Sequence, residues 1–296
     1  MTGKRKLWIA LFITPCMLLF GLIYAAPIVT VTATAFTRYT AAARPVFAGG
    51  ENFAALFRDK DFQIAVKNTL VWVLLQTTVH VSIGLGMALI LHKKPKGWKV
   101  ARTVYLIPNI VPTAATGIMF MLLLNPQFGV VKGLYKLLSI SGPVPNLFGN
   151  SRYAFVTVTC TWLFYSAFNT VIFLAQLGSV DKAIYEAAAI DGASPWQTDR
   201  HINLPALRGT IGTCVLLASV AMVSQFDIIY MTTRGGPGTA TLNLPVYLYK
   251  TMNLENNYGK ANAVGVVQII LGLGLAGLIR LLFGEKKSNR ETEAQL

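Results

Sequence analysis

Residues 186–205 read EAAAIDGASPWQTDRHINLP, a polar and well-punctuated segment between two long apolar stretches. Residues 181–191 favour a helix because they include three consecutive alanines. Gly192 can adopt the left-handed conformation that ends helices. Residues 194–197, Ser-Pro-Trp-Gln, supply in order an N-cap, a proline at the first helical position and the glutamine of a capping box. The segment therefore predicts a short helix, a sharp turn and a second short helix.

The rest of the chain is typical of a membrane protein. Of its 296 residues 54% are hydrophobic and 13% are charged, about half the charged share of a soluble domain. Six windows contain no Asp, Glu, Lys or Arg, namely 7–37, 68–91, 103–131, 153–180, 209–226 and 261–279. Each is roughly long enough to cross a hydrocarbon core of about 30 Å. A charge in the middle of a membrane costs about 2.5–3.5 kcal/mol, so their absence is informative. We predict an all-α membrane protein with six transmembrane helices.

The positive charge of the chain predicts its orientation. The net charge of +14 would suggest nucleic-acid binding in a soluble protein, but basic residues that flank membrane spans explain it here. The stretch 92–102 carries no acid and five cations, Lys93, Lys94, Lys96, Lys99 and Arg102. Six spans place both termini on the side of this basic loop. We therefore expect the termini, this loop and segment 181–208 to be cytoplasmic.

Neither an enzyme nor a metal site is indicated. Cys16, Cys160 and Cys214 lie far apart in apolar windows, without metal-ligand spacing, and are expected to be small core residues. The chain has no Gly-x-x-x-x-Gly-Lys-Ser/Thr loop to cradle the phosphates of ATP. We expect no catalytic residue and no bound metal or cofactor.

Segment 186–205 resembles the signature of the integral-membrane subunits of binding-protein-dependent ABC importers. That signature is Glu-Ala-Ala, three residues, Gly, nine residues, then Ile-x-Leu-Pro, and it is met by Glu186, Ala187, Ala188, Gly192, Ile202, Leu204 and Pro205. Segments 52–69, 108–129 and 226–259 also resemble sugar permeases of the maltose and glycerol-phosphate type, in the first of their two permease subunits. The resemblance implies the type I ABC importer permease fold, six transmembrane helices with a cytoplasmic coupling helix. It makes the seven signature residues, together with Asp191, ATPase-coupling residues.

The chain departs from the family pattern at a few positions. The family usually has an aromatic residue where Asp199 stands, and that aromatic packs into a pocket of the ATPase. Tryptophan is common near the position of Phe120, and asparagine where Lys132 stands. Because of Asp199, the sequence does not predict how this part of the coupling segment packs.

The resemblance implies that the chain has three parts. Residues 1–67 comprise the cytoplasmic N-terminus, the first transmembrane helix and an external segment. Residues 68–280 form the core transmembrane domain of five helices and contain the coupling loop 181–208. Residues 281–296 are a cytoplasmic tail.

The implied function is ATP-driven import of a sugar by alternating access, the sugar being a mono- or oligosaccharide or a derivative. The implied partners are a second permease subunit in a heterodimer, two ATPase subunits that use ATP and Mg, an extracellular or periplasmic sugar-binding protein, and the lipid bilayer, but no nucleic acid. The implied location is the bacterial plasma membrane. The alternatives are a permease of the same superfamily for a non-sugar solute, or a secondary transporter. A secondary transporter is disfavoured because none of the six windows holds an acidic residue that could couple transport to an ion.

A substrate path is harder to predict. Offsets of three, seven and fourteen residues put Trp162, Tyr165, Asn169 and Gln176 on one stripe if the fourth window is a single helix. Polar side chains in spans usually face the bundle interior. Asn169 and Gln176 could equally well only hold helices together, so both interpretations stay open. Gln225, Gln76 and His80 are weaker candidates.

Overall fold

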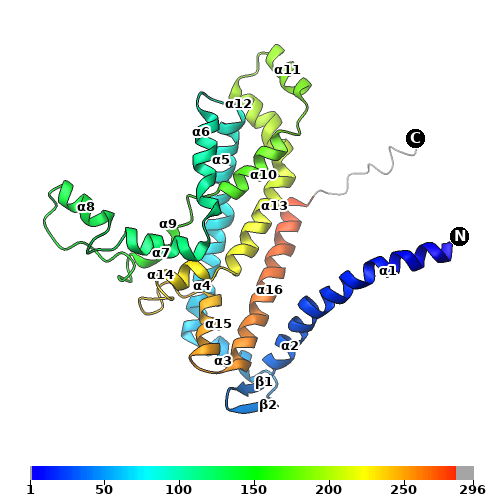
Figure 1. Cartoon of the computed structure of the whole chain (residues 1–296), viewed down its shortest axis with the longest axis vertical. Helices are drawn as coiled ribbons and strands as arrows, with labels where there is room; N and C mark the ends of the chain where they lie inside the picture. Colours follow the sequence, from blue (N-terminus) through cyan, green and yellow to red (C-terminus); the bar gives the residue numbers. More distant parts are fainter. Residues whose placement is uncertain (1, 285–296) are drawn as a thin grey trace. The chain divides into compact units, whose positions relative to one another are not determined.

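The computed structural model describes residues 2–284, which are mainly helical (Figure 1). They divide into two units, one from residues 2–63 with Tyr247–Ile270, the other from Ile64–Val246 with residues 271–284. Of the predicted tail 281–296, residues 285–296 lie outside the described residues.

Four helical segments are long and apolar enough to cross a membrane, and each overlaps one of the six predicted windows. These segments are Trp8–Ala35, Lys60–His92, Pro195–Val223 and Tyr258–Phe283. The first is built from α1 (Thr2–Phe20), a π-helical turn η1 (Gly21–Ala25) and α2 (Ala26–Ala35). The second is built from α4 (Lys60–Leu75), a π-helical turn η2 (Gln76–His80) and α5 (Val81–His92). The third runs from α12 (Pro195–Thr198) through η4 (Asp199–Asn203) into α13 (Leu204–Val223), and the last is α16.

The other two windows are not straight helices. In the third window, α6 (Trp98–Leu106) and the 3-10 turn η3 (Ile107–Ile110) meet α7 (Thr113–Leu123) at a bend of 101°. Pro108 lies in that turn and the backbone of Pro112 is extended, which explains the bend because proline cannot donate a helical hydrogen bond. The fourth window is divided into α9 (Ala154–Cys160) and α10 (Ala167–Leu177). By length and hydropathy the described residues hold four spans, or five if the bent pair is one span, so the count of six remains a prediction.

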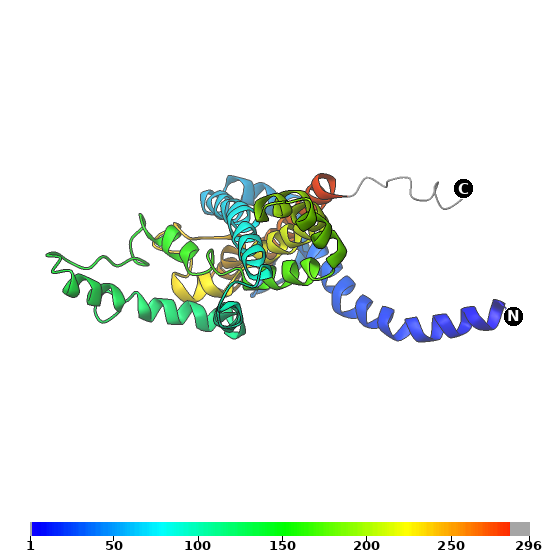
Figure 2. The same cartoon turned by 90° about the horizontal axis from the view of Figure 1, so that it is seen from above.

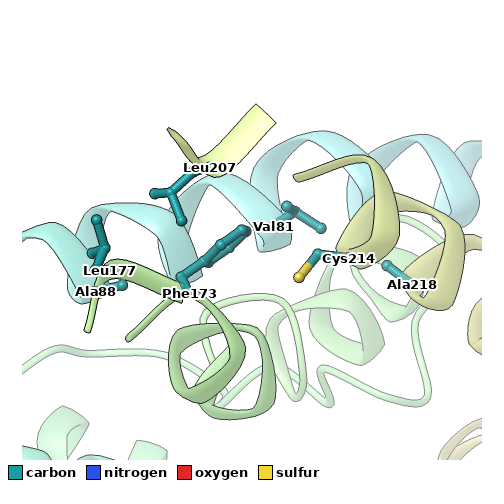
Figure 3. Packing of buried hydrophobic residues seen from close by; sticks show 7 residues of the cluster. All are labelled: Val81, Ala88, Phe173, Leu177, Leu207, Cys214 and Ala218. Atoms are coloured by element: carbon teal, nitrogen blue, oxygen red, sulfur yellow. The ribbon is translucent and has the colours of Figure 1, made fainter. Parts of the chain in front are cut away.

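The core of the second unit lies where α5, α10 and α13 pack against one another (Figures 1 and 2). Figure 3 shows its buried side chains, Val81 and Ala88 from α5, Phe173 and Leu177 from α10, and Leu207, Cys214 and Ala218 from α13. The helices approach closely at Gly84, where an added Cβ would lie 2.6 Å from Ser166 Oγ and 2.9 Å from Asn169 Cβ. Only glycine fits there without a shift of these neighbours, and glycine is common where transmembrane helices approach closely.

The cysteine prediction is correct only for Cys214. Cys16 and Cys160 are exposed on the surface of their helices. An apolar window does not distinguish the two faces of a membrane helix, because the face toward lipid is as apolar as the face toward protein.

The first unit contains a small hairpin that the all-α prediction omits. Strands β1 (Thr37–Thr40) and β2 (Ala43–Phe47) are antiparallel, with Thr37 opposite Phe47 and Arg38 opposite Val46. β-Branched and aromatic residues favour strands here. The hairpin is followed by α3 (Glu51–Arg58), where Asn52 donates Nδ2 to the carbonyls of Ala35 (2.7 Å) and Thr37 (2.8 Å).

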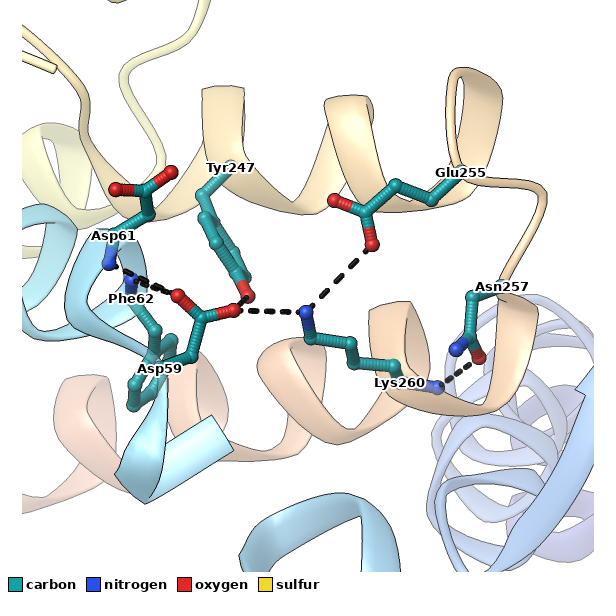
Figure 4. A network of polar contacts seen from close by, with 7 residues as sticks. All are labelled: Asp59, Asp61, Phe62, Tyr247, Glu255, Asn257 and Lys260. Carbon is teal, nitrogen blue, oxygen red and sulfur yellow. Dashed lines mark hydrogen bonds and ion pairs between the residues drawn. The ribbon is translucent and has the colours of Figure 1, made fainter. Parts of the chain in front are cut away.

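The loop before α4 is held by a network centred on Asp59 (Figure 4). Its Oδ2 accepts hydrogen bonds from Lys260 Nζ at 2.8 Å and from Tyr247 Oη at 2.7 Å. Lys260 lies in the first turn of α16, and Tyr247 lies on α15 (Leu244–Asn253). Its Oδ1 accepts the backbone N–H groups of Asp61 and Phe62. Partial burial acts to raise the pKa of Asp59, but these hydrogen bonds and the charge of Lys260 outweigh it and lower the pKa from 3.8 to about 2.

This network predicts acid sensitivity of the first unit. Since the pKa of Asp59 is lower in the folded protein, its contribution of about 2 kcal/mol is complete above pH ~4 and is lost as the pH falls toward 2. Asp59→Asn should therefore lower the melting temperature in detergent at pH 7, and the difference from wild type should shrink below pH 4. Asp61→Asn, a change at an exposed neighbour, is the control. A difference that stays constant between pH 7 and 3 would contradict this assignment.

Candidate functional site

The polar segment 181–205 has the predicted first helix and sharp turn, but its second helix is not short, because α12 continues through η4 into α13. Helix α11 (Lys182–Ile190) begins at Asp181, whose carboxylate accepts the N–H of Ala183 at 3.0 Å. Helix α12 begins at Ser194 with a complete capping box. The N–H of Ser194 donates to Gln197 Oε1 at 2.7 Å, and the N–H of Gln197 donates to Ser194 Oγ at 3.3 Å. Each helix start is thus stabilised locally, typically by about 1 kcal/mol.

The turn between the two helices is closed at Gly192. Its φ of +73° is in the left-handed region, where glycine is not penalised. The N–H of Gly192 donates to the carbonyl of Ala189 at 3.1 Å, and that of Ala193 to the carbonyl of Ala188 at 2.9 Å. These two bonds are those of a Schellman motif, and they fix the direction in which the chain leaves α11.

This helix-turn-helix exposes large apolar side chains although it is a polar segment. Ile190 is 87% exposed and Trp196 is 67% exposed, while Ile184 is also open to solvent. The segment also lines a hollow of about 310 Å³ between α11, α12 and residues His201 and Ile202 of η4. Figure 1 shows α11 and α12 at the end of the bundle formed by α5, α10 and α13. Exposed apolar side chains beside a hollow are typical of a surface that binds another protein.

The predicted coupling residues are distributed over this surface and its support. Glu186, Ala187, Asp191, Gly192 and Pro205 are exposed, and Ala188, Ile202 and Leu204 are half-buried. Four of them line the hollow, namely Ala188, Asp191, Gly192 and Ile202. Leu204 and Pro205 form the first turn of α13. The signature therefore combines a presented face on α11 with the point at which η4 continues into α13.

Asp199, the residue that departs from the family pattern, is turned into the protein. Its side chain is 7% exposed, and its Oδ2 lies 2.5 Å from Nζ of Lys93, whose side chain is 44% exposed. Its Oδ1 accepts a hydrogen bond from Asn203 Nδ2 at 2.8 Å. A buried carboxylate needs such partners because desolvating an unpaired charge is costly. Asp199 therefore joins the start of α13 to the loop that follows α5.

The contact continues into α11. Tyr185 donates its hydroxyl to Asn203 Oδ1 at 2.7 Å, and its ring lies 5.7 Å from the ring of His92. Burial raises the pKa of Tyr185, and the charge of Asp199 raises it further, so the phenol stays protonated and remains a donor. We call Lys93, Asp199, Asn203 and Tyr185 the polar chain. It holds α11 to η4 and to the end of α5.

Lys93, Asn203 and Tyr185 were not among the residues predicted from the sequence. Lys93 was counted only as one of five cations in a basic loop. The sequence contains one signal for the pairing of Asp199 with Asn203. The two residues are four positions apart, and polar residues at this spacing lie on the same face of a helix.

The predicted stripe on the fourth span is wrong for two of its members. Trp162 and Tyr165 lie in the turn between α9 and α10, whereas Asn169 and Gln176 lie on α10. The stretch before the break is rich in β-branched and aromatic residues, which are weak helix formers. Thr161 Oγ1 also donates to the carbonyl of Val158 at 2.6 Å and so competes with the helical pattern.

Side chains from other helices form hydrogen bonds with backbone groups in this break. His80 Nδ1 lies 2.9 Å from the carbonyl of Leu163, and the N–H of Ser166 donates to Tyr105 Oη at 3.1 Å. The rings of Tyr105 and Tyr165 are 6.0 Å apart. An interrupted helix inside a membrane requires such partners, and in transporters it often marks a binding region. Tyr105 and Ser166 therefore join the candidate path.

The remaining candidates occupy different surroundings. Asn169 is buried, donates to Ser166 Oγ at 2.9 Å and faces Gly84 of α5. Gln176 is half-buried. Gln76 lies in η2, and its Oε1 is buried without a hydrogen-bond partner among the described residues. Gln225 follows α13, and its backbone carbonyl accepts Asn243 Nδ2 at 2.6 Å.

Comparison with known proteins gives a consistent result. Residues 80–285 match the family described as binding-protein-dependent transport system inner membrane component. The sulfoquinovosyl glycerol transport system permease protein SmoG of Agrobacterium fabrum is 29% identical over 273 residues, covering 92% of this chain and 88% of that protein. The trehalose/maltose transport system permease protein MalF of Thermococcus litoralis is 31% identical over 228 residues, covering 77% of this chain and 76% of that protein.

A solved structure shares the fold. The structure of a bacterial alginate ABC transporter in complex with an alginate pentasaccharide-bound periplasmic protein contains a chain that matches with a TM-score of 0.82. Its sequence identity is 21%, and the match covers 94% of each chain. The family match extends over more than half of the sequence and includes the whole helix-turn-helix. This chain belongs to the family of binding-protein-dependent transport system inner membrane components.

Proposed function

We propose that this chain is a permease subunit of an ATP-driven importer and that it carries a sugar across the membrane by alternating access. The single observation that carries the proposal is the helix-turn-helix 181–205. It is locally fixed by two caps and a Schellman turn, and it presents Ile190 and Trp196 to a partner. Such a rigid element can transmit a movement without deforming.

The assignment of a sugar as substrate rests on the relatives. The two curated relatives are named for sulfoquinovosyl glycerol and for trehalose and maltose, and the structural neighbour for alginate. These compounds differ in size and charge but share a carbohydrate unit. We therefore propose a mono- or oligosaccharide or a sugar derivative for this chain.

The proposed assembly contains this chain, a second permease subunit, two ATPase subunits and an external sugar-binding protein. The segment 181–208 would lie in a cleft of one ATPase, with Glu186 and Gly192 in coupling roles rather than catalytic ones. ATP and Mg would be used by the ATPase, and this chain would bind neither of them and catalyse no reaction. Closure of the ATPase pair would move the segment, and the two permease subunits would respond by exposing the substrate path to the inside.

The proposed location is the bacterial plasma membrane, with both termini, the basic loop 92–102 and segment 181–208 in the cytoplasm. The concentration of Lys and Arg in the loop 92–102 supports this orientation.

Reconstitution of the assembled transporter in liposomes tests the function. With the binding protein outside and ATP inside, labelled sugar should accumulate only when ATP is hydrolysed. Uptake of a non-sugar solute but of none of the sugars maltose, trehalose, sulfoquinovosyl glycerol or an alginate oligosaccharide would identify a non-sugar permease. Uptake that is driven by an ion gradient in the absence of ATP would identify a secondary transporter.

A substitution at the interrupted fourth span tests the substrate path. Tyr165→Ala with Asn169→Ala should reduce sugar uptake roughly tenfold or more, because one or two hydrogen bonds to the substrate would be lost. Asn169 also packs against α5, so assembly yield and basal ATPase activity are measured alongside uptake. Reduced uptake with normal assembly supports a path residue. Reduced assembly with an unchanged KM for the sugar would show that these residues only hold helices together.

A further inference from the structure

The second unit contains a cavity of about 520 Å³ close to the polar chain but lined largely by other residues. Its walls come from the ends of α5 and α10, from the start of α6 and from α11. Cavities of this size accommodate a substantial part of a small amphiphile or drug-sized ligand.

Three of the residues that line the cavity are cationic, and we call these three the cationic rim. They are Lys94, Arg102 and Lys182, and none of the described residues that line the cavity is acidic. The Nζ of Lys94 lies 5.9 Å above the ring of Trp98, which holds this charge beside the cavity. Lys93 does not line the cavity, and its charge is paired with Asp199. The rim is therefore a site for a negatively charged group.

The inner walls are apolar. Leu91 lines the cavity from α5, and Val171, Leu174 and Leu177 line it from α10. These residues belong to two predicted spans, and Val171 is 40% exposed at the surface of the bundle. A soluble phosphate or sugar phosphate would leave this apolar surface unused. A phospholipid would cover it with its acyl chains while its headgroup reaches the rim.

We propose that this cavity binds an acidic phospholipid of the cytoplasmic leaflet, with the phosphate group at Lys94 and Arg102 and the acyl chains against α5 and α10. Trp98 is suited to this depth because tryptophan is enriched at the membrane–water boundary. Basic pockets between transmembrane helices on the cytoplasmic side bind acidic headgroups. The site uses none of the residues that form the hollow of the coupling segment.

The bound lipid would also contact the coupling segment. Lys182 and Tyr185 line the cavity from the first two turns of α11, and Tyr185 belongs to the polar chain. An acidic headgroup would therefore join α11 to the basic loop through a second set of contacts, so the lipid composition would influence how firmly α11 is held.

Native mass spectrometry of the assembled transporter measures this binding directly. Phosphatidylglycerol is compared with phosphatidylcholine of the same acyl chains, and glycerol phosphate serves as the headgroup without chains. The test variant is Lys94→Gln with Arg102→Gln. The matched control is Lys96→Gln with Lys99→Gln, which removes two charges from the same segment at exposed positions outside the cavity.

The wild type and the control should retain phosphatidylglycerol in preference to phosphatidylcholine, and the test variant should bind it about twenty-five-fold more weakly. This magnitude follows from about fivefold for each basic side chain near an acidic headgroup. Equal retention by the test variant and the control would overturn the proposal. So would tight binding of glycerol phosphate alone, or a lack of lipid preference because another subunit covers the cavity.

Discussion

Lys93→Ala should damage the transporter more than Asp199→Ala, although both changes break the same ion pair. Lys93→Ala leaves the carboxylate of Asp199, whose side chain is only 7% exposed, without its cation. An unpaired buried charge costs roughly 3–5 kcal/mol. Asp199→Ala leaves Lys93 unpaired, but water can solvate this lysine because its side chain is 44% exposed. The stability lost is then that of the hydrogen bond from Asn203, about 1–3 kcal/mol.

Thermal melting in detergent and the ratio of ATP hydrolysed to sugar transported measure the two effects. Both single variants should melt earlier and consume more ATP per sugar, with Lys93→Ala the worse of the two. The double variant Lys93→Met with Asp199→Leu should be milder than Lys93→Ala, because no unpaired charge remains. Additive losses, or a larger effect for Asp199→Ala, would contradict the geometry of the polar chain.

Gly192→Val should uncouple ATP hydrolysis from transport. At a φ of +73° a β-branched side chain collides with the backbone, and even an unbranched residue costs about 1–2 kcal/mol there. The Schellman bonds between residues 188–193 would be lost, and α11 would no longer have a fixed direction. We expect the ATPase to turn over at a near-normal basal rate while sugar uptake falls at least tenfold.

Two comparisons separate this effect from a general loss of stability. Gly192→Asn should retain most of the transport, since asparagine tolerates the left-handed conformation. Gly133→Val on α8 (Val130–Leu137) adds the same side chain where nothing lies within 4 Å, and φ there is not positive. Normal transport by Gly192→Val in a normally assembled complex would show that the turn has no coupling role.

The sequence was most informative where the decisive interactions are local. The capping box of Ser194 and Gln197 spans four residues, and the turn at Gly192 depends on one residue without a side chain. Both were predicted correctly because the partners are determined by spacing. The long apolar windows were equally informative, since the absence of charge is visible without knowledge of any contact.

Interactions between distant residues could not be predicted in this way. Asp199 and Lys93 are 106 positions apart, so only the packing of α5 against α13 brings them together. The break in the fourth span depends on His80 and Tyr105, which satisfy its backbone from other helices. Periodicity assumes a continuous helix, and it therefore placed Trp162 and Tyr165 on a stripe that does not exist. The exposure of Ile190 is not predicted either, because a pattern of residues does not specify which side of a helix a partner will cover.

Cross-linking at Ile190 tests the central claim most directly, namely that the helix-turn-helix 181–205 is the surface that receives the ATPase. Ile190→Cys is introduced into a chain whose three cysteines are replaced by alanine, and Leu254→Cys, at an exposed position outside this segment, is the control. In the assembled transporter a short thiol-to-amine cross-linker should join position 190, but not position 254, to the ATPase subunit. Cross-linking of position 190 only to lipid or to the second permease, with none to the ATPase, would contradict the account.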